Sequence, residues 1–388
     1  MTEKPSEGAR KRDRFLGGVA ATIFSVTLGL NSVAVPLLAI HAGYSVAEIG
    51  LLTAVPAIAQ IAARLTMGAM MRKLPDKVFI IASAIFMSLA CALVALSPFL
   101  IVFLLSQLLQ GVARAYFYTG SQTHAVRISH SAVGALTYLG LAGGVGSLIG
   151  PVLAGVISEQ SIEGALWFAA AFGALGIVPS ALLIRLPVFA AVSSIEGRVP
   201  GRIWRRPGVS TAASMTTTAG AWRGMLNSYV PVVLAQAGQT AAVIGALISV
   251  TNGAALLGSA LSTMARSAGI RFSLVFGVIA AGVGLAAVGL LAEFVLLTGA
   301  VLAFSGIGAG ILQTVGPALA SESVHPDEKG EAIASTGTFR ASALFVAPAG
   351  TAGLVLIMPI GIALFAVGLL IAVPALFGGR APNSREVD

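Results

Sequence analysis

The chain has 388 residues, of which 57% are hydrophobic and only 10% are charged. A soluble domain usually carries about 25% charged residues, and no water-soluble fold of this size could cover so much apolar surface. The composition therefore excludes an ordinary soluble protein and predicts an all-α integral membrane protein. The formal net charge of +8 could indicate a nucleic-acid partner, but the positions of the basic residues along the chain explain this charge differently.

The sequence offers little for catalysis or metal binding. The single cysteine, Cys91, lies in an apolar run and cannot form an internal disulfide. None of the four histidines has the spacing of metal ligands, and the chain lacks a Gly-rich phosphate loop, a nucleophile elbow and an HExxH motif. We therefore expect no enzyme activity, no cofactor and no bound metal.

Apolar stretches of membrane-spanning length follow one another along the whole chain. A helix that crosses about 30 Å of hydrocarbon needs roughly 20 mainly apolar residues. Twelve such stretches predict twelve transmembrane helices, at 15–38, 47–70, 78–97, 100–121, 134–157, 164–185, 209–235, 241–265, 272–292, 295–320, 331–355 and 360–377. The expected organisation is a tail (1–14), a six-helix lobe (15–186), a basic linker (187–208), a second six-helix lobe (209–378) and a second tail (379–388).

The basic residues lie on one side of this arrangement. All of the 23 Lys and Arg residues, except four arginines within the spans, fall in the tails or in the even-numbered connections. The odd-numbered connections contain none, and Glu48, Glu159, Glu163 and Glu293 lie in or beside them. The positive-inside rule then places both termini in the cytoplasm, in the cytoplasmic (inner) membrane. The basic charge would face anionic membrane lipids, and we expect no nucleic-acid partner.

The two halves of the chain share short sequences at nearly one fixed spacing. The run Leu30-Asn31-Ser32 recurs as Leu226-Asn227-Ser228, and Ile49-Gly50 recurs as Ile244-Gly245. In the fifth and eleventh spans, Ala135, Gly140 and Pro151 correspond to Ala332, Gly337 and Pro348. Such parallel repeats are typical of transporters whose two lobes rock about a central site, whereas a channel needs only a lined pore.

The fifth span contains Gly146-x-x-x-Gly150-Pro151-x-x-Ala154-Gly155. This run resembles the GxxxGPxxGG signature of exporters in the major facilitator superfamily, with Ala154 in place of one glycine. The resemblance extends over essentially the whole chain and implies two pseudo-symmetric six-helix lobes. It also implies that close packing of this span closes the leak route across the membrane. Packing of small residues against a neighbouring helix is the simpler interpretation of the same glycines.

Two other family motifs are degraded in this sequence. The loop after the second span is similar to GxxxDRxGRR from Gly68 on, but Arg72 replaces the acidic residue and Pro75 replaces a glycine. Lys73 matches the basic position, and Asp76 is the only acidic residue nearby. On the fourth span the family's RxxQG begins instead with Gln107, followed by Gln110 and Gly111. The arginine that the resemblance links to proton coupling is therefore absent.

Four arginines lie within the expected spans: Arg64, Arg114, Arg223 and Arg340. Each costs about 2.5–3.5 kcal/mol at a helix centre on insertion scales, and no Asp or Glu lies clearly within a span to neutralise it. We expect them to face a water-filled cavity or polar groups that line it. Arg64 could instead reach the headgroups, and the others could bond to backbone carbonyls. In the family, spans 1, 4, 7 and 10 tend to line the central cavity, which favours Arg114 and Arg223.

Polar and aromatic residues near these arginines complete the candidate site. On the fourth span, Gln107, Gln110, Arg114 and Tyr118 recur at helical spacing and form one polar stripe. Asn31 and Asn227 hold matching positions in the repeat, and Trp222 precedes an arginine. The candidate substrate-binding residues are Arg64, Arg114, Arg223, Arg340, Gln107, Gln110, Asn31, Asn227, Tyr118 and Trp222. Candidate gating and packing residues are Gly68, Arg72, Lys73, Asp76, Gly146, Gly150, Pro151 and Gly155.

Several positive charges without a carboxylate favour an anionic ligand, because a guanidinium binds carboxylate or phosphate through two parallel hydrogen bonds. The sequence therefore predicts secondary transport of a small organic anion or weak acid, outward, by a monomer. The alternatives are a proton-coupled drug exporter, which the fifth-span signature favours, and an anion exchanger or importer. Because no Asp, Glu or His lies near the centre of an expected span, we expect little response to a pH gradient. Glu293 and Glu322 are the exceptions if either lies deeper than expected.

Overall fold

The computed structural model describes residues 6–129, 132–188, 203–324 and 328–380. Within these ranges the chain folds into α-helices and short 3-10 segments, without a strand. Most of the expected linker, the first five residues and the last eight lie outside the described residues. The all-α prediction is therefore confirmed for the described part of the chain.

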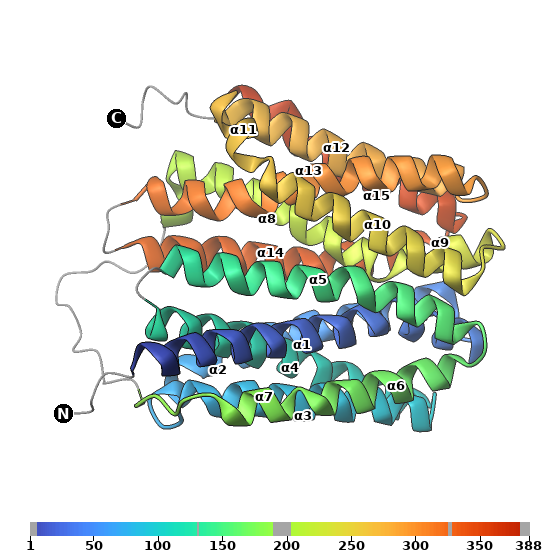
Figure 1. Ribbon diagram of the computed structural model, residues 1–388. Helices are drawn as coiled ribbons and strands as arrows, with labels where there is room; N and C mark the ends of the chain where they lie inside the picture. The colour runs from blue at the N-terminus through green and yellow to red at the C-terminus, as the bar shows by residue number, and fades with distance from the viewer. Residues whose placement is uncertain (1–5, 130–131, 189–202, 325–327, 381–388) are drawn as a thin grey trace. The chain divides into compact units, whose positions relative to one another are not determined.

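The helices follow the apolar stretches of the sequence closely (Figure 1). In the first half they are α1 (Glu7–His41), α2 (Val46–Met71), α3 (Asp76–Leu96), α4 (Leu100–Ile128), α5 (Ala132–Ser158), α6 (Ile162–Leu175) and α7 (Ile177–Leu182). In the second half they are η1 (Ile203–Arg205), α8 (Pro207–Leu226), α9 (Tyr229–Gln236), α10 (Ala241–Ala260), α11 (Ser262–Ser267), α12 (Ile270–Leu291), α13 (Val295–Glu322), α14 (Lys329–Leu354), α15 (Ile360–Ala372) and η3 (Val373–Arg380).

Side chains of the sequence decide where several helices begin. Ser45 and Glu48 form a capping box at the start of α2: the backbone N–H of Ser45 donates to Glu48 Oε2 at 2.8 Å, and the N–H of Glu48 donates to Ser45 Oγ at 3.3 Å. Ser161 accepts from the N–H of Gly164 at the start of α6, and Thr240 caps α10 in the same way. These caps satisfy backbone donors that a helix start leaves without partners.

Two expected spans are interrupted beside a proline, whereas the span expected at 241–265 breaks without one at Leu261, between α10 and α11. The span expected at 209–235 breaks at Asn227 and Ser228, because the ring of Pro231 removes the hydrogen bond that would return to the carbonyl of Asn227. The span expected at 164–185 bends at Gly176, where α6 ends and α7 begins, four residues after Phe172 and three before Pro179. Proline chemistry, rather than loss of apolar character, thus divides both stretches.

Nine helical stretches among the described residues are long and apolar enough to cross a membrane, with α6 and α7 counted together. The expected seventh, eleventh and twelfth spans are not among these nine, because each is too short or not apolar enough. The seventh is divided into α8 and α9, the eleventh carries Arg340, and α15 has only 13 residues. The chain is thus a multi-pass membrane protein by its helices, and the number of twelve spans stays a prediction.

Contacts along the backbone divide the chain into two compact units. Unit 1 comprises residues 1–42 and 58–194, and unit 2 comprises 43–57 and 195–388. The sequence instead predicts that the chain divides once, at the linker, into two six-helix lobes. The two divisions differ in the loop after α1 and the first turns of α2, which belong to unit 2 in the structure.

Within each unit the same pairs of repeat-related helices pack together. In unit 1, α1 packs against α5, and α3 packs against α4 and α6. In unit 2, α8 packs against α14, and α12 packs against α13 and α15. In the first half, span 1 thus packs against span 5, and span 3 packs against spans 4 and 6. In the second half, span 7 packs against span 11, and span 9 packs against spans 10 and 12. The internal sequence similarity thus has a counterpart in the packing of each unit.

The glycines of the fifth span bring α5 into backbone contact with α1. A Cβ added to Gly146 would lie 2.5 Å from the carbonyl oxygen of Thr22, and one added to Gly150 would overlap the carbonyl of Val26. Atoms essentially never approach so closely, so only glycine fits at these two positions. Gly155 is buried farther along the same helix. The small residues of this signature therefore pack α5 against its partner within unit 1.

Candidate functional site

The polar stripe on α4 lies where the sequence predicts it. Gln107 and Gln110 are both buried, with 2% and 3% of their surface exposed. Arg114 follows one turn after Gln110, and its Nη2 donates a short hydrogen bond to Gln110 Oε1. The helix therefore presents two amides and a guanidinium along one face.

Two donor atoms on this stripe lack a partner among the described residues. Nε2 of Gln107 and Nε of Arg114 are buried, and neither makes a hydrogen bond there. A buried polar atom left in this state costs about 1–3 kcal/mol. Since both atoms are hydrogen-bond donors, a ligand or water that accepts hydrogen bonds would recover this energy.

Aromatic rings pack beside the end of the stripe. Tyr118 contacts Phe24 and Phe117 edge-on, with ring centroids 6.0 and 5.9 Å apart. Phe24 of α1 and Phe117 stack with their centroids 4.0 Å apart. This cluster joins α1 to α4 and gives the polar stripe an apolar neighbour.

Two other candidates in the first half are placed differently. The side chain of Asn31 points into the interior of unit 1, where its Nδ2 donates to the carbonyl of Thr27 at 3.1 Å and to Cys91 Sγ at 3.0 Å. It therefore links α1 to α3. Arg64 of α2 is exposed, and it lies close enough to Tyr118, at the end of the α4 stripe, to interact with it electrostatically.

In unit 2 two arginines donate to amide oxygens from neighbouring helices. Nη1 of Arg223 on α8 lies 2.6 Å from Asn252 Oδ1 on α10. Nη2 of Arg340 on α14 lies 3.0 Å from Gln313 Oε1 on α13. Asn252 and Gln313 were not among the candidates from the sequence. Both are neutral amides, and each accepts a hydrogen bond that helps to orient the guanidinium group.

The packing of α8 on α14 brings these arginines to adjoining turns. Oγ1 of Thr216 donates to the carbonyl of Thr336 at 3.1 Å, which fixes the register of the two helices. One turn later, a Cβ on Gly220 would overlap the backbone of Arg340. Arg223 follows Gly220 by three residues, so it lies close to Arg340 on the facing helix.

Trp222 and Asn227 also lie on this segment. Trp222 is fully buried, and its Nε1 donates to Ser305 Oγ at 3.1 Å. The guanidinium carbon of Arg223 lies 4.9 Å from the centre of the Trp222 ring, so this ring helps to position the arginine. Asn227 caps α8 at the break before α9.

The acidic residues of unit 2 lie near the ends of its helices. The sequences of α8 and α10 contain no Asp or Glu, and Glu331 lies in the first turn of α14. Glu322, the last residue of α13, forms an ion pair with Arg266 of α11. Glu293 is exposed in the turn between α12 and α13. Neither of the two glutamates that could lie deeper than expected is in the middle of a helix.

The remaining gating candidates lie at the end of α2, in the loop after it and at the start of α3. Gly68, Arg72 and Lys73 are exposed, and a Cβ on Gly68 would meet open space. Asp76, by contrast, is 1% exposed. It accepts hydrogen bonds from the backbone N–H of Lys77 at 2.9 Å and from Arg127 Nη1 at 3.2 Å. The acidic residue of this loop is therefore held by groups of its own unit.

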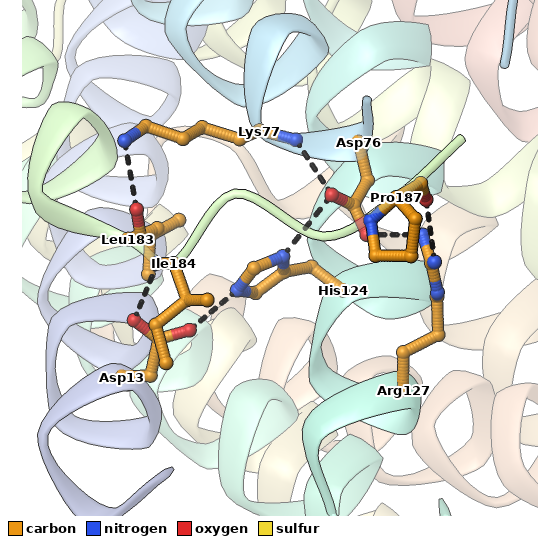
Figure 2. Close-up of polar contacts among 8 residues, drawn as sticks. All are labelled: Asp13, Asp76, Lys77, His124, Arg127, Leu183, Ile184 and Pro187. Carbon is orange, nitrogen blue, oxygen red and sulfur yellow. Dashed lines mark hydrogen bonds and ion pairs between the residues drawn. The ribbon is translucent and has the colours of Figure 1, made fainter. Parts of the chain in front are cut away.

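A buried histidine joins Asp76 to a second aspartate (Figure 2). Nδ1 of His124 lies 3.3 Å from Asp76 Oδ1, and its Nε2 lies 2.7 Å from Asp13 Oδ2. Asp13 is fully buried, and its other oxygen accepts from the backbone N–H of Ile184 at 2.8 Å. Each ring nitrogen thus faces a carboxylate oxygen, and only Nε2 makes a hydrogen bond, so the two nearby carboxylates favour the protonated ring mainly through their charge. His124 is accordingly a cation between two anions.

The same network holds the chain that follows α7. Nζ of Lys77 donates to the carbonyl of Leu183 at 2.7 Å, and Nη2 of Arg127 donates to the carbonyl of Pro187 at 2.6 Å. Together with the bond from Ile184 to Asp13, these contacts fix residues 183–187 against α1, α3 and α4. The network is therefore a structural clamp within unit 1.

A family model described as the Major Facilitator Superfamily matches residues 17–348. The chain belongs to the major facilitator superfamily. It is therefore a membrane transporter and not an enzyme. Among curated proteins, none matches the sequence closely enough to count as a relative.

Solved structures of other transporters share the fold of this superfamily member. A POT family transporter in complex with a thioalcohol-conjugated peptide has 12% sequence identity and a TM-score of 0.76, and the match covers 94% of this chain and 95% of that one. The nucleoside transporter NupG has 12% identity and a TM-score of 0.74, over 95% and 98% of the two chains. An inward-facing, unoccupied bacterial homologue of the human lysosomal transporter Spinster has 14% identity and a TM-score of 0.72, over 97% and 93%. Identities this low show a common fold.

Sequence reasoning missed the clamp of this superfamily member and the partners of its arginines. Asp13 sits in a run of charged residues that is typical of a solvated tail, and 111 residues separate it from His124. The available signal was that Asp13 directly precedes an apolar span and that His124 and Arg127 end another. Asn252 and Gln313 could have been noted as amides within apolar spans.

Proposed function

We propose that this chain is a secondary transporter that carries a small organic anion or weak acid outward by alternating access. In this proposal twelve spans form two six-helix lobes, and the protein acts as a monomer in the cytoplasmic (inner) membrane. Both termini lie in the cytoplasm, as the distribution of Lys and Arg requires. Labelling of a cysteine introduced at position 160 from outside, and at 200 only from inside, would test this orientation.

The observation that carries the proposal is the pair of buried donors on α4, Gln107 Nε2 and Arg114 Nε, that the described residues leave without an acceptor. A carboxylate or phosphate supplies several acceptor atoms and would satisfy both. A cationic drug would meet the positive charge of Arg114.

Unit 2 supports the same substrate class. The amide partners of Arg223 and Arg340 are neutral and hold the guanidinium groups in place. A guanidinium carries five N–H donors in a planar fork that matches the two oxygens of a carboxylate. We assign direct binding to Arg114, Gln107, Arg223 and Arg340. The supporting positions are Gln110, Tyr118, Trp222, Asn31, Asn227 and Arg64.

Energetics favour the outward direction. A membrane potential of 100 mV, negative inside, favours the exit of one negative charge by about 2.3 kcal/mol. An anion exporter of this kind needs no proton-carrying side chain. The signature at Gly146–Gly155 adds to the outward assignment by its resemblance to exporters.

A proton-coupled drug exporter is the second candidate, and the buried cluster of Asp13, His124 and Asp76 favours it. These are titratable groups, and proton coupling needs a group whose charge changes. Against this candidate, the cluster lies at the ends of α1, α3 and α4, where it fixes residues 183–187. We therefore assign it a structural role in the first instance.

A thermal-shift screen of the purified protein separates the two candidates. The ligands are organic acids, phosphorylated compounds and cationic drugs, each tested at one pH. A ligand that binds mainly the folded state raises the melting temperature. We expect organic anions to raise it, and Arg114→Gln to abolish the increase. Stabilisation by cationic drugs alone would favour the drug exporter.

A further inference from the structure

A second guanidinium group lies beside the polar stripe of α4. Arg64 of α2 and Arg114 of α4 each lie close enough to Tyr118 to interact with it electrostatically. Tyr118 follows Arg114 by one turn of α4, and all three residues belong to unit 1. Two arginines from different helices therefore lie near one tyrosine.

The contact between α2 and α4 explains why these arginines lie near each other. Ala63 of α2 and Ala115 of α4 are buried in one apolar cluster. Arg64 directly follows Ala63 in the chain. Arg114 directly precedes Ala115. Each arginine thus starts beside the place where the two helices pack together.

The two helices carry the same pair of polar residues at the same spacing. On α2, Gln60 precedes Arg64 by four residues, and on α4, Gln110 precedes Arg114 by four residues. Residues four apart lie on one face of a helix. Gln60 and Gln110 are both buried, with 6% and 3% of their surface exposed. Each helix therefore presents an amide and a guanidinium on one face.

No carboxylate neutralises this pair of arginines within the described residues. Neither Arg64 nor Arg114 forms an ion pair there, and Tyr118 is the group with which each interacts electrostatically. The sequence of α4 contains no Asp or Glu. On α2 the one acidic residue is Glu48 in the first turn, about 24 Å from Arg64 along the helix at 1.5 Å per residue. Two like charges near each other repel, and this repulsion favours a ligand with two negative charges.

The buried donors beside Arg114 provide hydrogen bonds for such a ligand. Nε2 of Gln107 and Nε of Arg114 have no acceptor among the described residues. A phosphate monoester or a dicarboxylate has several acceptor oxygens in addition to its two charges, and hydrogen bonds between charged groups are the strong ones. An anion with one charge could satisfy these donors, but it would neutralise only one of the two guanidinium groups.

Resting on the proposed function, we propose that the substrate carries two negative charges and that Arg64 and Arg114 bind it together. Arg64 is then a direct contact of the substrate instead of a supporting position. It is exposed, so its N–H donors are accessible to a ligand. Phosphate monoesters and dicarboxylates share the required chemistry, and the test includes both.

The test compares pairs of anions that match in size and differ by one charge. Phenyl phosphate and succinate carry two charges at about pH 7.5, whereas phenyl sulfate and succinamate carry one. Binding to the purified full-length protein is measured by the concentration dependence of its melting temperature. At least one doubly charged anion should bind roughly tenfold more tightly than its singly charged partner. Arg64→Gln should remove this preference and leave the affinity for the singly charged anion nearly unchanged.

Two variants control for general effects of charge. Arg12→Gln removes a positive charge from an exposed position of α1 and should keep the full preference for the doubly charged anion. Arg64→Lys retains the charge and should keep most of it. The melting temperature of each variant without ligand shows whether it is folded.

The outcomes separate this proposal from the proposed function. Equal affinity for both members of each pair, or a preference that survives in Arg64→Gln, would overturn the two-charge proposal and leave the anion site at Arg114 in place. Unchanged binding of all four anions in Arg114→Gln would contradict the proposed function itself. Failure of all four anions to bind would count against both.

Discussion

Gly29 of α1 lies directly against the ring of Pro151 of α5: a Cβ added to Gly29 would come within 2.7 Å of Pro151 Cδ. The second half of the chain repeats this relationship. A Cβ on Gly224 of α8 would lie 3.1 Å from Pro348 Cδ on α14. In each half, a proline ring of one helix thus packs directly against a glycine of another, where a larger residue would clash. The repeated halves of the sequence preserve this contact within each unit.

The first prediction concerns these glycine contacts. Gly150→Ala should lower the melting temperature, because the added Cβ would overlap the carbonyl of Val26 and force α1 and α5 apart. Gly140→Ala, at an open position of α5, should leave it unchanged or raise it, since alanine favours a helix by about 1 kcal/mol over glycine. Thermal unfolding in one detergent measures both variants. Equal melting temperatures would show that the close contact contributes nothing.

The second prediction concerns the buried clamp of unit 1. His124→Gln keeps a similar size but removes the positive charge between Asp13 and Asp76. Two buried carboxylates would then lack their cation, and breaking a buried pair in this way costs about 3–5 kcal/mol. The expected result is a large fall in thermal stability. His41→Gln changes an exposed histidine at the end of α1 and should have little effect.

Comparable stability of the two histidine variants would contradict the cationic assignment of His124. It would also remove the reason to regard residues 183–187 as clamped. Limited proteolysis near residue 185 gives a second measurement. The clamp predicts faster cleavage there in His124→Gln than in His41→Gln.

The third prediction uses two glutamines one turn apart on α4. Gln107→Leu removes a buried donor that lacks a partner, so the stability of the ligand-free protein should stay the same or rise. Gln110→Leu removes the acceptor of Arg114 and should lower stability by about 1.5–3 kcal/mol. If Gln107 binds substrate, its leucine variant should also have a raised KM. An unchanged KM would place Gln107 outside the binding site.

The sequence predicts the positions of the helices because each apolar stretch has its own local signals. Ser45 with Glu48, and Thr240, cap helices whose starts are visible in the chain itself. The breaks were missed because prolines act differently in different settings: Pro231 follows a break, whereas Pro151 lies inside a continuous helix. Packing against α1 supports the helix around Pro151.

The candidate site is predicted only in part, and the reason is pairing over long sequence distances. The stripe of Gln107, Gln110 and Arg114 follows from helical spacing alone. Asn252 is the partner of Arg223 because of the way α8 packs near α10, and the spacing of residues within one helix cannot predict this contact. Asp13 was assigned to a solvated tail for the same reason: its burial depends on a histidine from another helix.

The fourth prediction concerns energy coupling. A guanidinium group keeps its proton under physiological conditions, so we do not expect Arg114, Arg223 and Arg340 to carry protons through a transport cycle. Transport in liposomes should respond to membrane potential or to a counter-anion. It should respond little to an imposed pH gradient once ionisation of the substrate is corrected for.

A strong flux driven by the pH gradient, abolished by Glu293→Gln or Glu322→Gln, would contradict the fourth prediction. Loss of that flux in His124→Gln would instead assign the proton to the clamp of unit 1. Either result would place proton-coupled export first.

The central claim is that the substrate is an anion, and transport in proteoliposomes by variants of Arg223 and Arg340, two of the assigned binding residues, tests it most directly. Arg223→Lys and Arg340→Lys keep the charge but lose the planar pair of donors, so each should weaken transport roughly tenfold. Arg223→Ala and Arg340→Ala should nearly abolish it, with melting temperatures that show a folded protein. Arg271→Ala, at an exposed position of unit 2, should transport normally. An unchanged transport rate in both Arg223→Ala and Arg340→Ala would contradict the anion assignment.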